Sequence, residues 1–448
     1  MNIAASIVFV VIMLGVLASV HELAHFFVAR LLKIKVFEVS LFVGPKVLKW
    51  KHKDVDFSIR LIPLGAYVRF SEVDEEGYVV NSDDPALLVN QPRFKRLLVA
   101  IAGPLMNLFL GILIFFGMFC ATGFYSLEMG PAIAGTQTAD VAEEFTEGDM
   151  IRKVNGQTVF TVYDLNYELD SIDAKEDLTL TLQSKETGKY YDVVLVPEVF
   201  NRPMLMINVL TLETENEYEG WEVYSVDPGQ NKGNPILQPG DYVTHINGVS
   251  VNDEGFDDYI FNYEGDVLDV TYVRDGEVHE DEIIPEYVEY VTVRGVRPIG
   301  YELNSPIAFG KAFIYAAKMP FALVNFTVRG IRDIIAGKVK AYNLVSGPIG
   351  ITSMVNDVVK DEQESTGDKI YLLIMLSGVI SIALAYSNLL PIPGLDGVQI
   401  LLIVVEMVIG RKLSEKAEGR LTEIGFVMII FLVIVALVSD VLRIIFGY

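Results

Sequence analysis

The stretch that decides the fold is residues 4–32, AASIVFVVIMLGVLASVHELAHFFVARLL. As a helix it is long enough to cross a hydrocarbon layer of roughly 30 Å. Three further apolar stretches of similar character are residues 97–124, residues 370–390 with a continuation at 398–409, and residues 424–445. The sequence therefore predicts a polytopic α-helical membrane protein with about four transmembrane helices.

The first predicted span contains the sequence HELAH at residues 21–25. Two histidines four residues apart share one helical face and can bind one zinc ion, so His21 and His25 are candidate ligands and Glu22 is the candidate general base. Placing an ionisable residue inside a membrane span costs roughly 2.5–3.5 kcal/mol, so we expect such a residue to be present because it has a function. The alternative, that the span ends near Ser19 and these groups are interfacial, is disfavoured because FFVARLL continues the apolar helix.

The best candidate for a third ligand is Asp396, in the sequence NLLPIPGLDG at residues 388–397. Two prolines and two glycines break the third predicted span there, and a break at membrane depth is tolerated only inside protein or beside a watery cavity. Zinc in a catalytic site takes three protein ligands and keeps a position open for water. Without the HELAH motif, a Pro-Gly turn capped by an aspartate would be the preferred interpretation.

The acidic charge is concentrated between the second and third predicted spans. Residues 125–305 hold 37 acidic and 10 basic residues, whereas the whole chain has a formal charge of −24. Such a segment would repel phosphates, so nucleic acid is not an expected partner. Basic residues gather instead in the loops at 33–60, 93–96 and 411–420, which predicts that these loops are cytoplasmic and that both termini and the acidic segment lie outside.

The acidic segment contains an internal repeat. GDMIRKVNGQTV at residues 148–159 matches GDYVTHINGVSV at residues 240–251, and each copy enters an Asn-Gly hairpin turn. Two copies of one small domain are expected, at residues 125–205 and 206–300. The pattern resembles PDZ domains, which bind extended peptides at a sheet edge, so a peptide or a substrate ectodomain is a possible partner.

The remaining segments are assigned by composition. Residues 36–70, within a first region at 1–124, alternate apolar and polar residues around Gly-Pro turns, which predicts β-hairpins associated with the membrane. Residues 301–345 are apolar with spaced basic residues and with Pro320, which predicts either amphipathic helices on the membrane surface or a helix that packs on the second PDZ-like domain. Residues 346–448 contain the third and fourth spans.

Together these motifs resemble the site-2 protease family of intramembrane zinc metalloproteases, and the tandem repeat resembles its bacterial regulator-of-sigma-E type. The resemblance implies that His21, His25 and Asp396 bind zinc and that Glu22 is catalytic. It further implies three substrate-binding residues, Asn388 of NLLPIPGLDG, Asn107 of GPLMN (103–107) and Gly44 of GP (44–45). The sequence departs from the family pattern at Phe42, where glycine is expected, and at Val398.

The resemblance implies cleavage of single-span membrane proteins, within the bilayer of a bacterial inner membrane, after their outer domains have been trimmed. An anti-sigma factor or leftover signal peptides are the expected substrates. Two other functions stay open. One is an inactive zinc-binding scaffold that acts through its PDZ-like domains, against which the intact Glu22 argues. The other is a transporter, for which neither an inverted repeat nor a second broken span is present.

Overall fold

The structure is a computed structural model that describes residues 3–71, 83–210, 220–253, 255–261, 263–338, 340, 347–360, 365–411 and 415–446. The chain divides into two compact units. The first, here called the membrane unit, comprises Met1–Leu127, Val159–Asn166 and Pro298–Tyr448. The second, called the β unit, comprises Glu128–Thr158 and Tyr167–Arg297.

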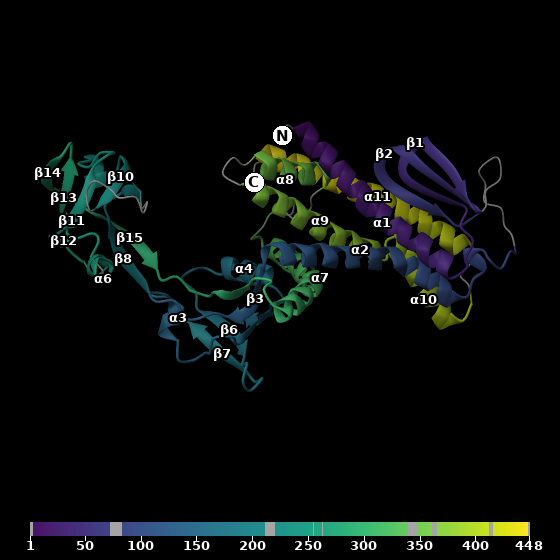
Figure 1. Ribbon diagram of the computed structural model, residues 1–448, viewed down its shortest axis with the longest axis horizontal. Coiled ribbons are helices and arrows are strands. Elements are labelled where there is room, and N and C mark those ends of the chain that lie inside the picture. The colour runs from purple at the N-terminus through teal and green to yellow at the C-terminus, as the bar shows by residue number, and fades with distance from the viewer. Residues whose placement is uncertain are drawn as a thin grey trace. The chain divides into compact units, whose positions relative to one another are not determined.

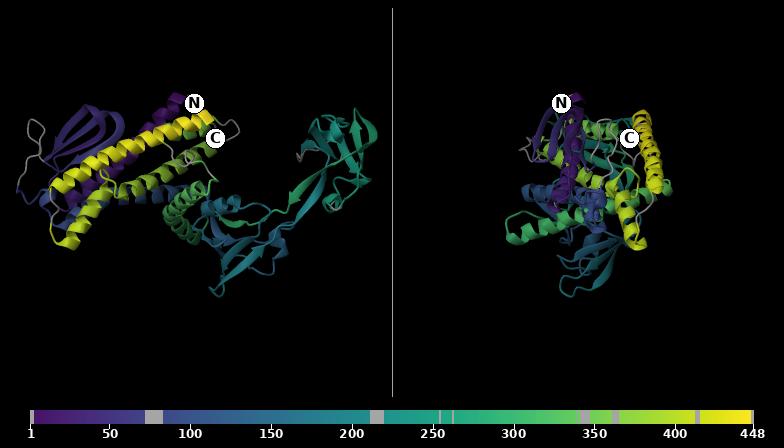
Figure 2. Two further views of the ribbon diagram at one scale, coloured as in Figure 1. Left: turned by 180° about the vertical axis from the view of Figure 1, so that it is seen from behind. Right: turned by 90° about the vertical axis from the view of Figure 1, so that its right-hand side faces the viewer.

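Long helices dominate the membrane unit, and several of them run side by side (Figures 1 and 2). In chain order they are α1 (Ile3–Leu31), α2 (Arg93–Thr122), α7 (Pro306–Ile335), α8 (Pro348–Lys360), α9 (Thr366–Leu389), α10 (Asp396–Ile409) and α11 (Glu415–Phe446), with a 3₁₀ turn, η1 (Leu88–Asn90), before α2. In the described chain, four helical segments are long and apolar enough to cross a membrane: Ser6–Leu31, Arg93–Thr122, Pro306–Ile335 and Thr366–Leu389. The fold is that of a helical membrane protein with added β-sheets.

The third of these segments differs from the sequence prediction only in its continuity; its place on the membrane surface or against the second PDZ-like domain stays a prediction. Residues 301–345 were expected to form helices interrupted at Pro320, whereas α7 is one helix of 30 residues that continues through this proline. A proline inside a helix removes one backbone hydrogen bond, and apolar helices tolerate that loss. The start of α7 carries a recognisable signal, because Ser305 caps it by accepting a hydrogen bond from the amide of Ala308 and Pro306 occupies the first turn. The predicted last span lies in α11, where the apolar stretch found is shorter, Ile430–Leu442.

Small residues bring α2 and α9 into close contact. A Cβ atom at Gly111 of α2 would lie 3.1 Å from the carbonyl oxygen of Gly378 in α9, and one at Gly378 would lie 2.9 Å from the ring of Phe115. Close backbone approach at small residues is the usual way in which membrane helices pack. On the other side of α9, Met13 and Leu17 of α1 form an apolar cluster with Ile380. These contacts fix α1, α2 and α9 as one bundle.

The predicted break in the third span is present between α9 and α10. Leu390, which follows α9, has an extended backbone, and α10 begins at Asp396 after a turn at Gly394 with φ of 98°. A Cβ atom at Gly397 would collide with the backbone of Leu389 and Leu390, so only glycine fits at this position. The close packing of the segment between α9 and α10 determines where α10 begins.

The predicted hairpin region forms one curved antiparallel sheet from β1 (Glu38–His52) and β2 (Val55–Arg69). Both strands bend so strongly that residues 38–41 of β1 pair with residues 56–59 on one side and with residues 66–69 on the other. Residues 66–69 therefore lie at an edge of this sheet. The sheet packs against α1, where a Cβ atom at Gly15 would meet the carbonyl group of Pro63 in β2.

The chain contains two segments with the same order of elements, which lie in the β unit except for Val159–Asn166. The first is β4 (Met150–Val154), β5 (Gln157–Thr158), α4 (Val162–Ser171), β6 (Leu178–Gln183) and β7 (Tyr190–Leu195). The second is β11 (Tyr242–Ile246), β12 (Val249–Ser250), α6 (Phe256–Phe261), β13 (Leu268–Arg274) and β14 (Glu277–Ile283). Both Asn-Gly turns have positive φ at both residues, as a tight hairpin turn requires.

Further elements precede or follow these two segments in the chain. They are β3 (Phe124–Met129) and α3 (Gln137–Asp140) before β4, β9 (Ile207–Leu210), β10 (Trp221–Val226) and α5 (Gln230–Gly233) before β11, and β16 (Pro298–Tyr301) in the membrane unit. The strand order in the second segment is β14-β13-β11-β10-β9. Strands β8 (Val199–Met204) and β15 (Glu286–Val291) form a separate two-stranded ribbon. The assignment of both segments as PDZ-like domains, with the bounds 125–205 and 206–300, stays a prediction.

Candidate metal centre

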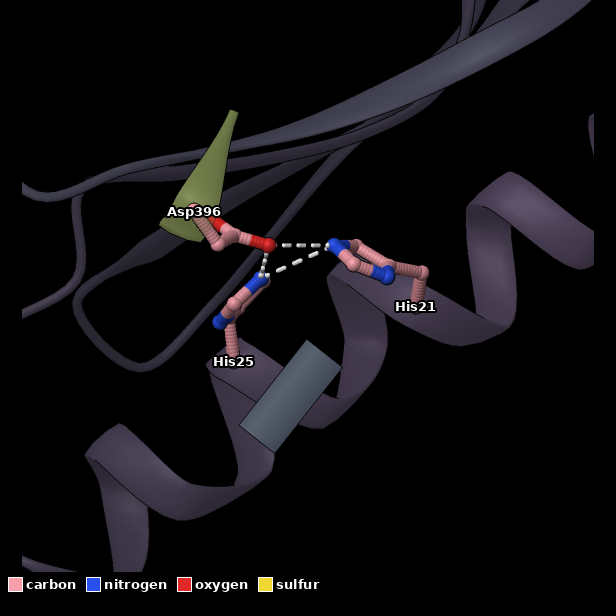
Figure 3. A group of neighbouring side chains, drawn as sticks. All are labelled: His21, His25 and Asp396. Carbon is pink, nitrogen blue, oxygen red and sulfur yellow. Dashed lines mark hydrogen bonds and ion pairs between the residues drawn. The ribbon is translucent and has the colours of Figure 1, made fainter. Parts of the chain in front are cut away.

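Two histidine side chains project from one face of α1 towards an aspartate of α10 (Figure 3). His21 and His25 are both buried, and their Nε2 atoms are 3.2 Å apart. Their spacing of four residues is close to one helical turn, which is why the two imidazoles point the same way. The structure thus brings the predicted ligand pair together.

The third predicted ligand comes from a segment almost four hundred residues away in the sequence. Oδ2 of Asp396 lies 2.9 Å from Nε2 of His21 and 3.4 Å from Nε2 of His25. Asp396 is the first residue of α10, so the turn that ends α9 determines its position. The proline and glycine residues of that turn therefore serve to turn a carboxylate towards α1.

The geometry of these three groups fits a zinc ion. The three ligand atoms lie within 4.8 Å of one another. Tetrahedral zinc with ligand bonds of about 2.0–2.1 Å requires ligand atoms to be separated by about 3.3 Å, close to the three distances found. Gly103 of α2 leaves space beside the imidazoles, because a Cβ atom there would lie 2.5 Å from Nε2 of His21 and would also collide with His25. Two imidazoles and one carboxylate are a typical catalytic zinc donor set.

Hydrogen bonds from α2 orient both imidazoles. Nδ1 of His25 donates to the carbonyl oxygen of Val99 at 2.7 Å, which leaves Nε2 free for a metal. Nδ1 of His21 lies 3.4 Å from the side-chain nitrogen of Asn107, whose Oδ1 is buried without a hydrogen-bond partner in the described structure. The two amide atoms are nearly indistinguishable in shape. Exchanging them lets Oδ1 accept the Nδ1 proton of His21 and satisfies both groups.

A cavity of about 190 Å³ adjoins the three ligands. It is lined by residues of α1, β2, α2, α9, α10 and the turn between α9 and α10: Ala18, His21, Glu22, Gly65, Ala66, Asn107, Leu384, Asn388, Gly394, Leu395 and Asp396. Glu22 therefore shares one space with two of the ligands and with both predicted substrate-binding asparagines. Ala66 belongs to the part of β2 that forms the sheet edge, and Gly65 directly precedes it, so this edge borders the same cavity.

The predicted substrate-binding residue Gly44 is not among the described residues that line this cavity. Gly44 lies in β1, has φ of 90°, and its carbonyl oxygen accepts a hydrogen bond from the guanidinium of Arg60 at 2.8 Å. Two residues earlier, Phe42 has φ of 66°, a backbone conformation that glycine adopts without steric cost. The glycine expected at this position would thus suit the observed backbone better than phenylalanine does.

Sequence reasoning predicted Asn107 of α2 but missed the other residues of α2 and β2 that shape the site. The roles of Gly103 and of the Val99 carbonyl group depend on helix packing, which no residue pattern reports directly. Gly103 did stand in the segment GPLMN (103–107), which resembles a family motif. The sequence therefore marked Gly103 as part of a family motif but did not indicate its contact with the two imidazoles.

Comparison with known proteins identifies the family of the chain. The family model for peptidase family M50 matches residues 9–432. The chain belongs to peptidase family M50. Among its relatives, the zinc metalloprotease RasP of Oceanobacillus iheyensis is 24% identical over 460 residues, covering 98% of this chain and 99% of the relative. A protein of Clostridium acetobutylicum named as a putative zinc metalloprotease is 25% identical over 438 residues, covering 97% of each chain.

Membership of peptidase family M50 identifies the chain as a zinc metalloprotease of the site-2 type. The resemblance inferred from the sequence motifs is therefore confirmed at the level of family, enzyme class and metal. The family match spans both α1 and α10, the two helices that bring His21, His25 and Asp396 together. The individual roles of these residues are proposals that rest on the geometry described above.

Proposed function

We propose that this M50 protease cleaves the transmembrane segments of single-span membrane proteins inside the bilayer, with His21, His25 and Asp396 as zinc ligands and Glu22 as general base. The observation that carries the proposal is the cluster of these ligands within 4.8 Å, built on α1 and on the helix that follows the broken span α9. Ionisable groups in apolar helices are costly, and metal-dependent chemistry explains their retention.

The metal and the side chains around the cavity have separate roles in the proposed peptide hydrolysis. Zinc, when bound, supplies a Lewis acid and makes water acidic enough to react near neutral pH. Glu22 lines the cavity and is placed to take a proton from water and to return it to the leaving amine. Asn388 and Asn107 offer amide groups to a peptide backbone in the same cavity.

A helical substrate must expose its peptide bond before cleavage, because its amides are engaged in internal hydrogen bonds. The edge of the β1–β2 sheet at residues 66–69 borders the cavity through Ala66. Backbone groups at a sheet edge bind an extended chain by adding it as a further strand. We therefore propose that the substrate unwinds and pairs with this edge as it reaches Glu22.

The β unit is proposed to consist of two PDZ-like domains on the outer side of a bacterial inner membrane. The basic loops before α2 and after α10 support that orientation, which also places both termini outside. The proposed role of these domains is to exclude substrates whose outer domains have not been trimmed. Anti-sigma factors and leftover signal peptides are the substrate classes proposed.

Replacing Glu22 by glutamine tests the proposal. The variant should bind zinc as the wild type does, because glutamine keeps the shape and none of the three ligands changes. Its cleavage of a co-expressed single-span reporter should fall by roughly 10²–10⁴-fold, the usual contribution of a general base. Glu186→Gln, at an exposed position of the β unit, is the matched control and should cleave normally. Cleavage by Glu22→Gln at the wild-type rate would show that another group is the base.

A further inference from the structure

The first two turns of α2 contact both helices that carry the ligands. On the side of α1, Nζ of Lys95 lies 3.4 Å from the carbonyl oxygen of Leu32, and the Val99 carbonyl accepts from His25. On the side of α10, the guanidinium of Arg96 lies 2.7 Å from Oε2 of Glu406, and that of Arg93 donates to the carbonyl oxygen of Gly410 at 2.8 Å. The start of α2 therefore holds the end of α1 and the end of α10 together.

The Arg96–Glu406 ion pair has one fully buried partner and one partly buried partner. The side chain of Glu406 is 1% exposed and that of Arg96 is 17% exposed. Removing two charges from water costs several kcal/mol per ion, so a buried pair often stabilises a fold no better than two apolar residues would. Such pairs are better explained where they fix one alignment of the two elements that they join. Here the elements are α2, which orients both imidazoles, and α10, which begins with Asp396.

The alignment of α10 determines whether Asp396 reaches the metal. Ten residues separate Asp396 from Glu406, or about 15 Å along a rigid helix. A shift of α10 along its axis therefore moves both residues by the same amount. Metal sites tolerate errors of only about 0.2 Å in ligand distance, so even a small slip of α10 removes a ligand.

We propose that Arg96 and Glu406, supported by the bond from Arg93 to Gly410, are positioning residues that set the axial position of α10 and so hold Asp396 at the metal. This inference rests on the proposed role of Asp396 as a ligand. The pair is too far along α10 to contact the metal itself. It acts through the helix, and its removal changes the affinity for zinc without changing any of the three ligands.

Zinc affinity of the purified full chain, measured by competition with a chelator, tests the inference. Glu406→Gln and Arg96→Gln each leave one partner unpaired and should raise the zinc Kd by about 10–100-fold, as loss of an outer partner of a metal site does. The exchanged pair Arg96→Glu/Glu406→Arg should restore the Kd to within about threefold of the wild type, because it restores the attraction between the helices. Arg30→Gln is the matched control, because Arg30 is exposed at the end of α1.

The outcomes separate positioning from simple stabilisation. Helicity and elution as a single species show whether each variant is folded, and Kd is compared among folded samples only. Arg96→Lys keeps the charge but loses the guanidinium geometry, so it should fold and still weaken zinc binding severalfold. The inference is overturned if Arg96→Lys and the two single glutamine variants all keep the wild-type zinc Kd. It is also overturned if the exchanged pair does not restore the zinc Kd. Asp396→Ala, measured alongside, tests the ligand assignment separately, because an unchanged Kd there would refute the proposed site itself.

Discussion

Replacing Gly103 by alanine should disrupt the metal site without changing any ligand. The added Cβ would lie 2.5 Å from Nε2 and 2.7 Å from Cε1 of His21, and it would also meet Nε2 of His25. Ordinary van der Waals contact begins at 3.4 Å, so the imidazole of His21 has to retreat by about 0.9 Å. This displacement exceeds the roughly 0.2 Å that metal–ligand distances tolerate.

The expected magnitude follows from the number of ligands disturbed. Loss of a single outer partner typically costs 10–100-fold in metal affinity, and here two ligands are displaced directly. We expect the zinc Kd of Gly103→Ala to rise by at least about 100-fold, or about 2.7 kcal/mol. Helix propensity acts in the opposite direction, because alanine in place of glycine favours a helix by roughly 0.5–1 kcal/mol.

A control within the same helix separates the two effects. Gly117 also lies in α2, and a Cβ atom there would meet no described atom within 4 Å. Gly117→Ala should therefore bind zinc and cleave a reporter as the wild type does. The assay is chelator competition on both variants, purified in detergent, together with reporter cleavage in cells. Equal zinc affinity in Gly103→Ala and Gly117→Ala would refute the described packing of α2 against the two imidazoles.

Three further predictions follow from other parts of the structure. Asn107→Leu should raise the zinc Kd by about 10-fold, because Nδ1 of His21 loses its partner; chelator competition measures this. Burial alone would raise the pKa of Asp149, but hydrogen bonds from Tyr191 and from the amides of Lys185 and Thr146 lower it below its ordinary value. Its stabilising effect is therefore full above pH about 4 and is lost as the pH falls through the lowered pKa, so acid should lower the hydrogen-exchange protection factors of β4 and β6 in the wild type more than in Asp149→Asn. Finally, Met204 of β8 pairs with Glu286 of β15, so replacing residues 205–285 by an Asn-Gly turn should leave a closed hairpin. This variant should cleave an untrimmed substrate that the wild type rejects. If the variant still rejects that substrate, the second PDZ-like domain does not act as a filter.

Local patterns in the sequence were sufficient to identify the three candidate ligands that the structure brings together. His21 and His25 are four residues apart in one helix, so their proximity follows from helical geometry alone. The prolines and glycines around Asp396 identified the break between α9 and α10. That Asp396 meets α1 could be inferred only because zinc requires a further ligand, and the structure brings its Oδ2 to 2.9 Å from His21.

Features that depend on packing between distant elements were not predictable in this way. Nothing near Glu406 in the sequence indicates Arg96 as its partner, because the contact depends on how α2 and α10 cross. The glycine at position 103 matters through the two imidazoles that face it. The continuity of α7 through Pro320 has a different cause, since a proline inside an apolar helix removes one backbone hydrogen bond without ending the helix.

The zinc content of the purified chain tests the central claim most directly. The wild type should hold one zinc ion per chain after removal of loosely bound metal, and His21→Ala, His25→Ala and Asp396→Ala should each lose most of it. His52→Ala, which changes an exposed histidine in β1, should keep it. A wild-type chain that retains no zinc, or three ligand variants that retain as much as His52→Ala, would contradict a metal site shared by α1 and α10.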